Sequence, residues 1–257
     1  CKVPALIHEQ NVYPGLTVKG AEKYVSCIAV SFEETLNHLK KDKCVVTGNP
    51  VRTKILEADK AKAREALGLG EEPFVLVFGG SLGADKINEN VIGMLEKVCS
   101  EKKFRLKFAT GDRNFENINK TIQEKKIELS DNVEIVPYIN NMHEVMAAAD
   151  IVISRAGAST CNEIAAAGVP CILIPSPNVT ANHQEKNARA LEEQGAAAVI
   201  LEENCTAQAV MDKIRQLLED RNAYNKMHDA LLEIAVPDSA QRMCDIMEEL
   251  TSGKTKK

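Results

Sequence analysis

A polar, glycine-bearing turn precedes an alanine-rich helix in the stretch SRAGASTCNEIAAAGVP, which starts at Ser154. Thr160-x-x-Glu163 has the spacing of a capping box, in which each side chain binds a backbone amide at the helix start. A capping box would explain these two residues, but it would not explain Gly157. A helix amino terminus also presents free N–H groups and a partial positive charge, which suit a phosphate.

A second glycine-bearing turn lies in VLVFGGSLGADKIN, residues 75–88. An apolar run ends at GGSLG and a helical pattern follows, and glycines let a backbone turn tightly and approach a ligand closely. The turn is not a P-loop, because the GK[ST] ending is missing. It does match the G-x-S-x-G of a hydrolase nucleophile elbow, so a serine hydrolase using Ser81 stays open, as does a purely structural turn.

Both turns need a parallel sheet that positions them. Short apolar runs rich in β-branched residues alternate with helical patterns, which predicts an α/β fold with helices covering the sheet. Two such turns at the carboxyl edge of one sheet would form a nucleotide crevice, where Glu163 would accept hydrogen bonds from ribose hydroxyls. The runs expected to form strands are PALIHE, VSCIAVS, KCVVTG, PFVLVFGG, FRLKFATG, NVEIVPY, DIVISRAG, PCILIPS and AAAVILEE.

The pattern changes at two places along the chain. The residues of GNPVR interrupt it, which predicts a linker near residues 48–54 between the end of one α/β domain and a complete second one. After Cys205 no run is typical of a strand, and we expect helices over 206–219, 221–234 and 238–250.

The composition excludes several classes of function. The chain has 257 residues, a net charge of -5, 4% aromatic residues and no Trp, which argues against a partner that is a nucleic acid. Eight cysteines occur without a CxxC pair, so zinc and thioredoxin-like sites lack support. HEQN at residues 8–11 is not the zinc motif H-E-x-x-H, although His8 and Glu9 end a predicted strand. Arg52 follows a proline turn and would suit a phosphate or a carboxylate.

Several stretches together resemble one family of bacterial enzymes. They are IHEQNVYPGLT, VVTGNPVR, VFGGSLGADKIN, VPYINNMHEVMAAADIVISRAGASTCNEIAAAGVPCILIPSP and NHQEKNA, in order and without large gaps between Val3 and Met247. The resemblance is to the glycosyltransferases that add N-acetylglucosamine to undecaprenyl-pyrophosphoryl-N-acetylmuramyl-pentapeptide, turning lipid I into lipid II in peptidoglycan synthesis. It implies a GT-B fold, in which two Rossmann-like domains with parallel sheets face a cleft and the carboxyl-terminal one binds UDP-N-acetylglucosamine.

The resemblance assigns the nucleotide to the two glycine-bearing turns. It implies that Ile139, with Met142 behind it, meets the uracil, that Ser81 contacts the diphosphate and that Glu163 holds the ribose. Amides and hydroxyls at the start of the second helix would hold the phosphates, and these belong to Ala158, Ser159 and Thr160.

The resemblance places the sugar between the two domains. Asn11 and Arg52 would reach the donor from the interdomain side, and Gln184 would bind the sugar hydroxyls. His183 lies beside Gln184, and its role stays open. No metal and no cofactor is expected, because no acidic DxD-like cluster lies near the turns.

The resemblance also implies a division of the chain. Residues 1–50 would be the second half of an acceptor-side domain, 51–237 the donor-binding domain, and 238–257 a closing helix and tail that return to the first domain. An acceptor loop, a candidate catalytic base and a membrane-binding patch would precede residue 1. We therefore expect a chain truncated at its amino terminus that binds the donor and does not catalyse transfer alone.

The intact enzyme would transfer the sugar with inversion. The C4 hydroxyl of the acceptor would attack the anomeric carbon, and helix amino termini would stabilise the departing UDP. The partners would be UDP-N-acetylglucosamine and lipid I, at the cytoplasmic face of the plasma membrane, where the enzyme would be peripheral. The alternatives are a related GT-B transferase for another lipid, a UDP-sugar epimerase, a donor-binding subunit with a separate partner, and the Ser81 hydrolase.

Overall fold

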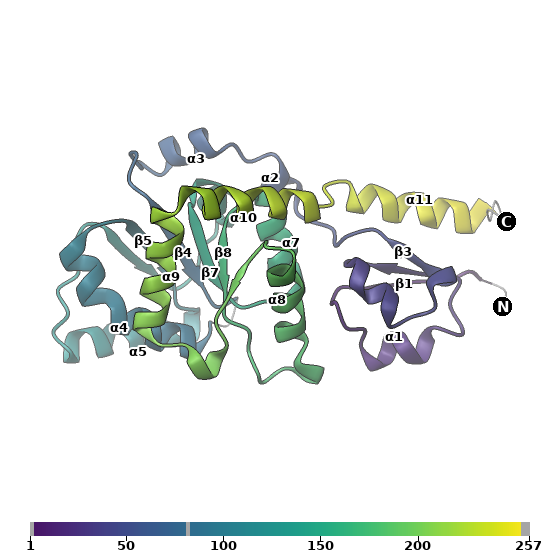
Figure 1. The fold of residues 1–257 in the computed structure, drawn as a ribbon, viewed down its shortest axis with the longest axis horizontal. Helices are drawn as coiled ribbons and strands as arrows, with labels where there is room; N and C mark the ends of the chain where they lie inside the picture. Colours follow the sequence, from purple (N-terminus) through teal and green to yellow (C-terminus); the bar gives the residue numbers. More distant parts are fainter. Residues whose placement is uncertain (1–2, 81–82, 253–257) are drawn as a thin grey trace.

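The smaller of two parallel sheets is formed by the first 50 residues. The computed structural model describes residues 3–80 and 83–252. Within them the small sheet has the order β1-β2-β3, with β2 in the middle and fully buried. A short helix α1 packs against it (Figure 1). The bounds are β1 Leu6–Glu9, α1 Leu16–Ala21, β2 Cys27–Val30 and β3 Cys44–Val46.

The larger sheet contains six parallel strands in the order β6-β5-β4-β7-β8-β9. The central strands carry FVLVF, IVIS and CIL, and every one of these residues is buried. Such continuous apolar strands are typical of a sheet that is covered on both faces. The bounds are β4 Phe74–Phe78, β5 Arg105–Ala109, β6 Val133–Val136, β7 Ile151–Ser154, β8 Cys171–Leu173 and β9 Ala198–Val199.

Helices cover both faces of the larger sheet. The chain moves outward from β4 to β6, returns to β7 and continues to β9, and right-handed crossovers place the helices of the two directions on opposite faces. Accordingly α4 contacts α5 and α9, whereas α7 contacts α6 and α8. The bounds are α4 Asp85–Glu101, α5 Asp112–Glu124, α6 Met142–Ala148, α7 Ala158–Ala167, α8 His183–Glu193 and α9 Ala207–Glu219.

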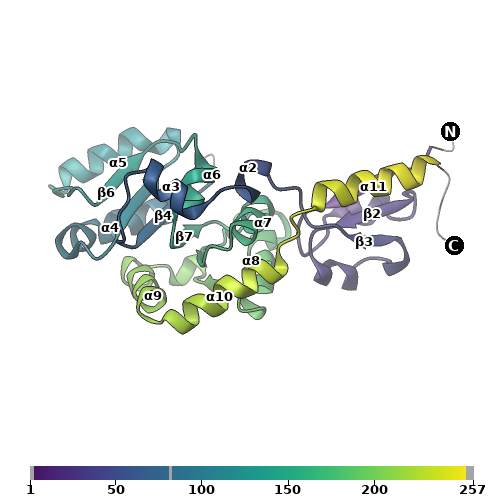
Figure 2. The same ribbon diagram turned by 90° about the horizontal axis from the view of Figure 1, so that it is seen from above.

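Two chain segments connect the small sheet with the larger one. The first carries α2 (Thr53–Leu56) and α3 (Lys60–Ala66), and the second leads from α10 (Arg221–Ile234) into α11 (Ser239–Ser252). Helix α11 lies alongside the small sheet in both views (Figures 1 and 2). None of the helices in the described part of the chain has the length and apolar character that crossing a membrane requires.

The predicted α/β fold with parallel sheets is confirmed. All nine runs expected to form strands contain one, and α9, α10 and α11 match the three helices expected after Cys205 to within two residues. The short helices α2 and α3 were not predicted, because the Gly, Asn and Pro residues of GNPVR indicated only a linker.

Candidate functional site

The two glycine-bearing turns lie side by side. Strands β4 and β7 are neighbours, and Phe78 at the end of one pairs with Ser154 at the end of the other. The chain runs in opposite directions along the sheet from these two strands, so their carboxyl ends mark the topological switch point. In open α/β sheets ligands bind in the crevice at this point. The predicted juxtaposition of the two turns is therefore present.

The glycines of the first turn are required by the backbone. A Cβ on Gly79 would lie 2.4 Å from the Ala84 amide nitrogen, and one on Gly83 would lie 2.2 Å from the Thr110 carbonyl oxygen. Gly80 and Gly83 also have φ of 89° and 78°, which side chains disfavour. Ser81, the predicted diphosphate contact, lies outside the described residues.

The second turn is different, because its glycine has an ordinary conformation. Gly157 has φ -66° and ψ 143°, and a Cβ there would have Thr160 Oγ1, 3.9 Å away, as its nearest neighbour. Gly157 is the N-cap of α7, and the first helical bond runs from Cys161 N–H to its carbonyl. The first helical turn of α7 contains no acidic residue, and no side chain of the described residues caps it. Within the described residues no side chain caps the amides of Ala158, Ser159 and Thr160, and such uncapped amides favour an anion.

The predicted capping box is wrong. It requires Thr160 as N-cap, but α7 begins two residues earlier, at Ala158, so Thr160 and Glu163 lie within the helix. The extended backbone of Gly157 leads directly into the helix, and a cap three residues later is not needed. Glu163 instead accepts a hydrogen bond from Arg52, with 3.0 Å between Oε1 and Nε.

The Arg52–Glu163 pair joins two of the predicted donor contacts. Arg52 precedes α2 in the connecting segment, so the pair links this segment to α7. The Arg52 side chain is 57% exposed and that of Glu163 is 21% exposed. Exposed pairs of this kind contribute about 0.2–1 kcal/mol to stability. The pair therefore matters more for the direction of the Glu163 carboxylate than for the stability of the fold.

Gln184 lies at the start of α8 and contacts the segment that follows β8. Its Oε1 accepts a hydrogen bond of 2.9 Å from the Ser176 amide, which follows β8. The fixed oxygen leaves the NH₂ group to donate to a ligand. Ala181 and Asn182 precede it with φ of 52° and 54°, a strained conformation that is frequent at binding sites. The neighbouring His183 has a buried Nδ1 for which the described residues provide no partner.

Asn187 is a residue of the site that the sequence did not indicate. Its side chain is fully buried and bridges the small sheet and the larger one. Oδ1 accepts from the Val12 amide at 3.0 Å, while Nδ2 donates to Asn11 Oδ1 at 3.1 Å and to the Ala156 carbonyl at 3.2 Å. Asn187 thus connects the second glycine-bearing turn, through Ala156, with the loop after β1. The available signal was a polar residue among buried positions of α8, such as Ala188 and Leu191.

Asn11 is held by its own chain. Its amide nitrogens lie 2.9 Å and 3.2 Å from Glu9 Oε1, and Glu9, which is only 4% exposed, also accepts from the Gly15 amide at 2.8 Å. Its Oδ1 accepts from Asn187. Asn11 and Glu9 therefore shape the loop that faces the larger sheet.

The residues predicted for the uracil follow β6. Ile139 is 4% exposed and Met142 packs against the core, so neither side chain projects freely toward a base. Tyr138, beside them, is 51% exposed.

Two further groups near α7 have structural roles. Arg155 forms an ion pair with Glu202 and donates to the Ile174 carbonyl at 3.0 Å, so its charge is already neutralised. Burial raises the pKa of the Cys161 thiol to about 12. This thiol stays protonated at neutral pH and is not a nucleophile.

Comparison with known proteins agrees with this geometry. Residues 74–243 match the glycosyltransferase family 28 C-terminal domain. A UDP-N-acetylglucosamine--N-acetylmuramyl-(pentapeptide) pyrophosphoryl-undecaprenol N-acetylglucosamine transferase of Acetivibrio thermocellus is 45% identical over 98% of this chain and 68% of its own length. The chain belongs to this family of N-acetylglucosamine transferases. The resemblance inferred from the sequence motifs is therefore confirmed.

Other members of the family support the same assignment. The transferase of Caldanaerobacter subterraneus subsp. tengcongensis is 42% identical over 97% of this chain and 69% of its own length. The crystal structure of Acinetobacter baumannii MurG superposes with a TM-score of 0.76 and 26% identity, covering 96% of this chain and 68% of that one. The predicted GT-B class agrees with this superposition.

Proposed function

We propose that this chain binds UDP-N-acetylglucosamine and is part of an enzyme that transfers N-acetylglucosamine to N-acetylmuramyl-(pentapeptide) pyrophosphoryl-undecaprenol in peptidoglycan synthesis. The observation that carries the proposal is the open amino terminus of α7 at the switch point, with Glu163 one turn further along the same helix. Together with the family, this arrangement supports a nucleoside diphosphate as the ligand.

In this proposal the diphosphate lies against the amides of Ala158, Ser159 and Thr160. The ribose hydroxyls donate to Glu163, whose carboxylate is directed by Arg52. The sugar lies toward α8, where the NH₂ group of Gln184 is free to donate. Residues 51–237 would form the donor-binding domain, and residues 1–50 with 238–257 the other side of the cleft.

The proposed reaction is a direct displacement at the anomeric carbon. The acceptor hydroxyl forms the new C–O bond and gives up its proton to a base as the bond to the UDP oxygen breaks, and UDP departs as a diphosphate anion. The negative charge that develops on that oxygen is stabilised by preorganised amide groups at the start of α7. The candidate base is not assigned to any described residue.

The acceptor determines where the reaction occurs. An undecaprenol chain is apolar and stays in a bilayer, whereas a sugar nucleotide is water-soluble, so the two meet at a membrane surface. We propose the cytoplasmic face of the bacterial plasma membrane, with the enzyme bound as a peripheral protein.

Calorimetric titration of UDP and of uridine tests the role of Glu163. Glu163→Gln removes the charged acceptor, and hydrogen bonds to charged groups contribute about 1.5–3 kcal/mol. We therefore expect both ligands to bind about ten- to a hundredfold more weakly. Arg52→Ala should also weaken both equally, since it acts through Glu163. A loss of UDP affinity alone would mean that Arg52 contacts the phosphates directly, and unchanged binding by Glu163→Gln would refute the ribose assignment.

A further inference from the structure

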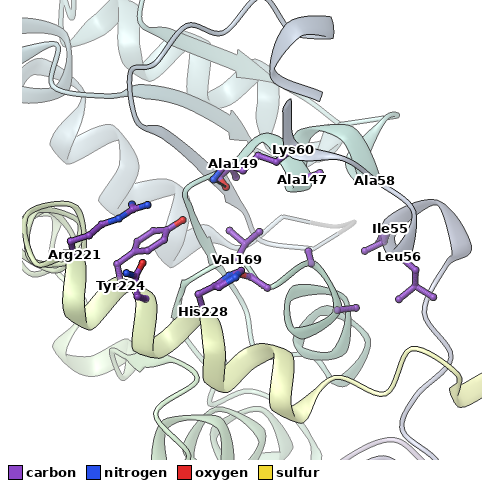
Figure 3. Close-up of a pocket in the computed structure, with 14 residues that line it drawn as sticks. Ile55, Leu56, Ala58, Lys60, Ala147, Ala149, Val169, Arg221, Tyr224 and His228 are labelled. Atoms are coloured by element: carbon purple, nitrogen blue, oxygen red, sulfur yellow. Dashed lines mark hydrogen bonds between the residues drawn. The ribbon is translucent and has the colours of Figure 1, made fainter. Parts of the chain in front are cut away.

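A cavity of about 380 Å³ opens at the opposite edge of the large sheet from the candidate donor site (Figure 3). Its walls come from α2, the start of α3, the end of α6, the end of α7 and α10. Helix α7 has 10 residues, so its phosphate-facing start lies about 15 Å from the end that borders the cavity. The cavity is therefore separate from the donor site, although one helix contributes to both.

One end of the cavity carries an excess of positive charge. The carboxylate of Asp150 lies at this end and already binds Lys60 at 2.7 Å, Arg64 at 3.1 Å and the Phe74 amide at 2.8 Å. Arg221 adds a further cation, which lies 4.7 Å from the centre of the Tyr224 ring. Three cations against one carboxylate favour an anionic ligand at this end.

The Tyr224 phenol lies between these charges. In Figure 3 its hydroxyl points toward Lys60, beside Arg221. Burial raises the pKa of Tyr224 despite the nearby Lys60 and Arg221, so at neutral pH the hydroxyl keeps its proton and can donate. The anionic end of a ligand would thus meet two cations and one neutral donor.

The end of the cavity opposite Arg221 is apolar. Ile55 and Leu56 of α2 lie at the far end from Arg221, and Val169 lies between the two ends (Figure 3). His228 is fixed because its Nδ1 donates to the Gly168 carbonyl, which leaves Nε2 available to a ligand. The cavity is therefore amphipathic along its length.

We propose that this cavity is a second ligand site, for a small amphipathic anion. The anionic group lies between Lys60 and Arg221, and a compact apolar body lies over Val169 toward Ile55. A ligand in this position contacts both α2 and α10, the helices that end the two connections to the small sheet.

Phenyl phosphate is a suitable probe, titrated with UDP at saturation so that the phosphate-binding turn is occupied. Inorganic phosphate has only the anionic group of the probe and phenol has only its ring, so each should bind at least about tenfold more weakly. Lys60→Gln and Arg221→Gln should each weaken the probe about two- to fivefold. Ala167→Leu, which extends a side chain into the cavity, should weaken it more than either.

Lys120→Gln is the matched control, because Lys120 is exposed on α5 and far along the chain from the cavity. It should bind the probe like the parent, and thermal unfolding should show that every variant is folded. Equal binding of phenyl phosphate and inorganic phosphate would overturn the proposal. So would an affinity for the probe that all three cavity variants leave unchanged.

Discussion

The two glycine-bearing turns of the large sheet resemble each other in sequence and differ in what their glycines do. In the first turn, Gly79 and Gly83 have no room for a side chain because other backbone atoms occupy it, and Gly83 has a left-handed conformation. In the second, Gly157 has an extended conformation that any residue adopts, and a Cβ there would meet only Thr160 Oγ1 within 4 Å among the described residues. The backbone of the first turn therefore requires glycine, whereas that of the second does not.

The difference shows that a glycine after a buried strand is not always required by the backbone. At Gly83 a methyl group would collide with the Thr110 carbonyl oxygen, so the residue is needed whether or not a ligand binds. At Gly157, the N-cap of α7, a methyl group would meet only Thr160 Oγ1 within 4 Å among the described residues. Substitutions should therefore separate stability from binding.

The largest effect is expected for Gly83→Ala. A strained backbone costs about 1–3 kcal/mol and a steric overlap about as much again, so the free energy of unfolding should fall by about 2–6 kcal/mol. Gly80→Ala is the matched control, since its φ is 89° but its Cβ would meet no atom of the described residues within 4 Å. It should lose only the conformational part, about 1–3 kcal/mol. Urea unfolding measures both, and equal losses would show that the overlap at Gly83 is relieved.

The next effect concerns the support below the second turn. Asn187→Ala leaves the Val12 amide and the Ala156 carbonyl without their buried partner. We expect unfolding to become easier by about 1–3 kcal/mol, with a weaker affinity for UDP as the turn loosens. Asn222→Ala, an exposed position on α10, should change stability by less than about 0.5 kcal/mol. An Asn187→Ala protein with unchanged stability and UDP affinity would mean that the second glycine-bearing turn keeps its conformation without Asn187.

The smallest expected effect is the pH dependence of stability that comes from His8, which contacts a third glycine, Gly48. Like Gly83, Gly48 is required by the backbone. Its φ is 71° and a Cβ would lie 2.6 Å from Val236, and its carbonyl oxygen lies 3.2 Å from His8 Nε2. Burial lowers the pKa of His8 below 6.5 in spite of this bond and of Glu9. The unfolded chain therefore takes up the proton first, and stability should fall as the pH drops below 6.5.

His8→Gln tests this dependence, because Gln does not titrate. Thermal unfolding between about pH 7 and about pH 5.5 should show a smaller loss of Tm for the variant than for the parent. Parallel curves for the two proteins would show that other groups cause the pH dependence.

The sequence predicted those features that depend on local pattern. Apolar runs such as PFVLVFGG predicted strands correctly, because burial on both faces requires them. The start of α7 was placed wrongly, because a capping box at Thr160 and a glycine cap at Gly157 fit the same residues. The Asn187–Val12 and Arg52–Glu163 contacts join positions 175 and 111 residues apart, and no local spacing encodes such pairs. The domain boundaries and the donor contacts remain predictions.

Titration of UDP into the parent and into Gly157→Ala tests the central claim most directly. The substitution suits the backbone, so the free energy of unfolding should change by less than about 1 kcal/mol. The added methyl group lies at the start of α7, where the proposed diphosphate binds, so UDP should bind at least about tenfold more weakly, while uridine, which lacks the diphosphate, should bind as before. A Gly157→Ala protein that is stable and binds UDP as tightly as the parent would contradict the assignment of the diphosphate to this turn.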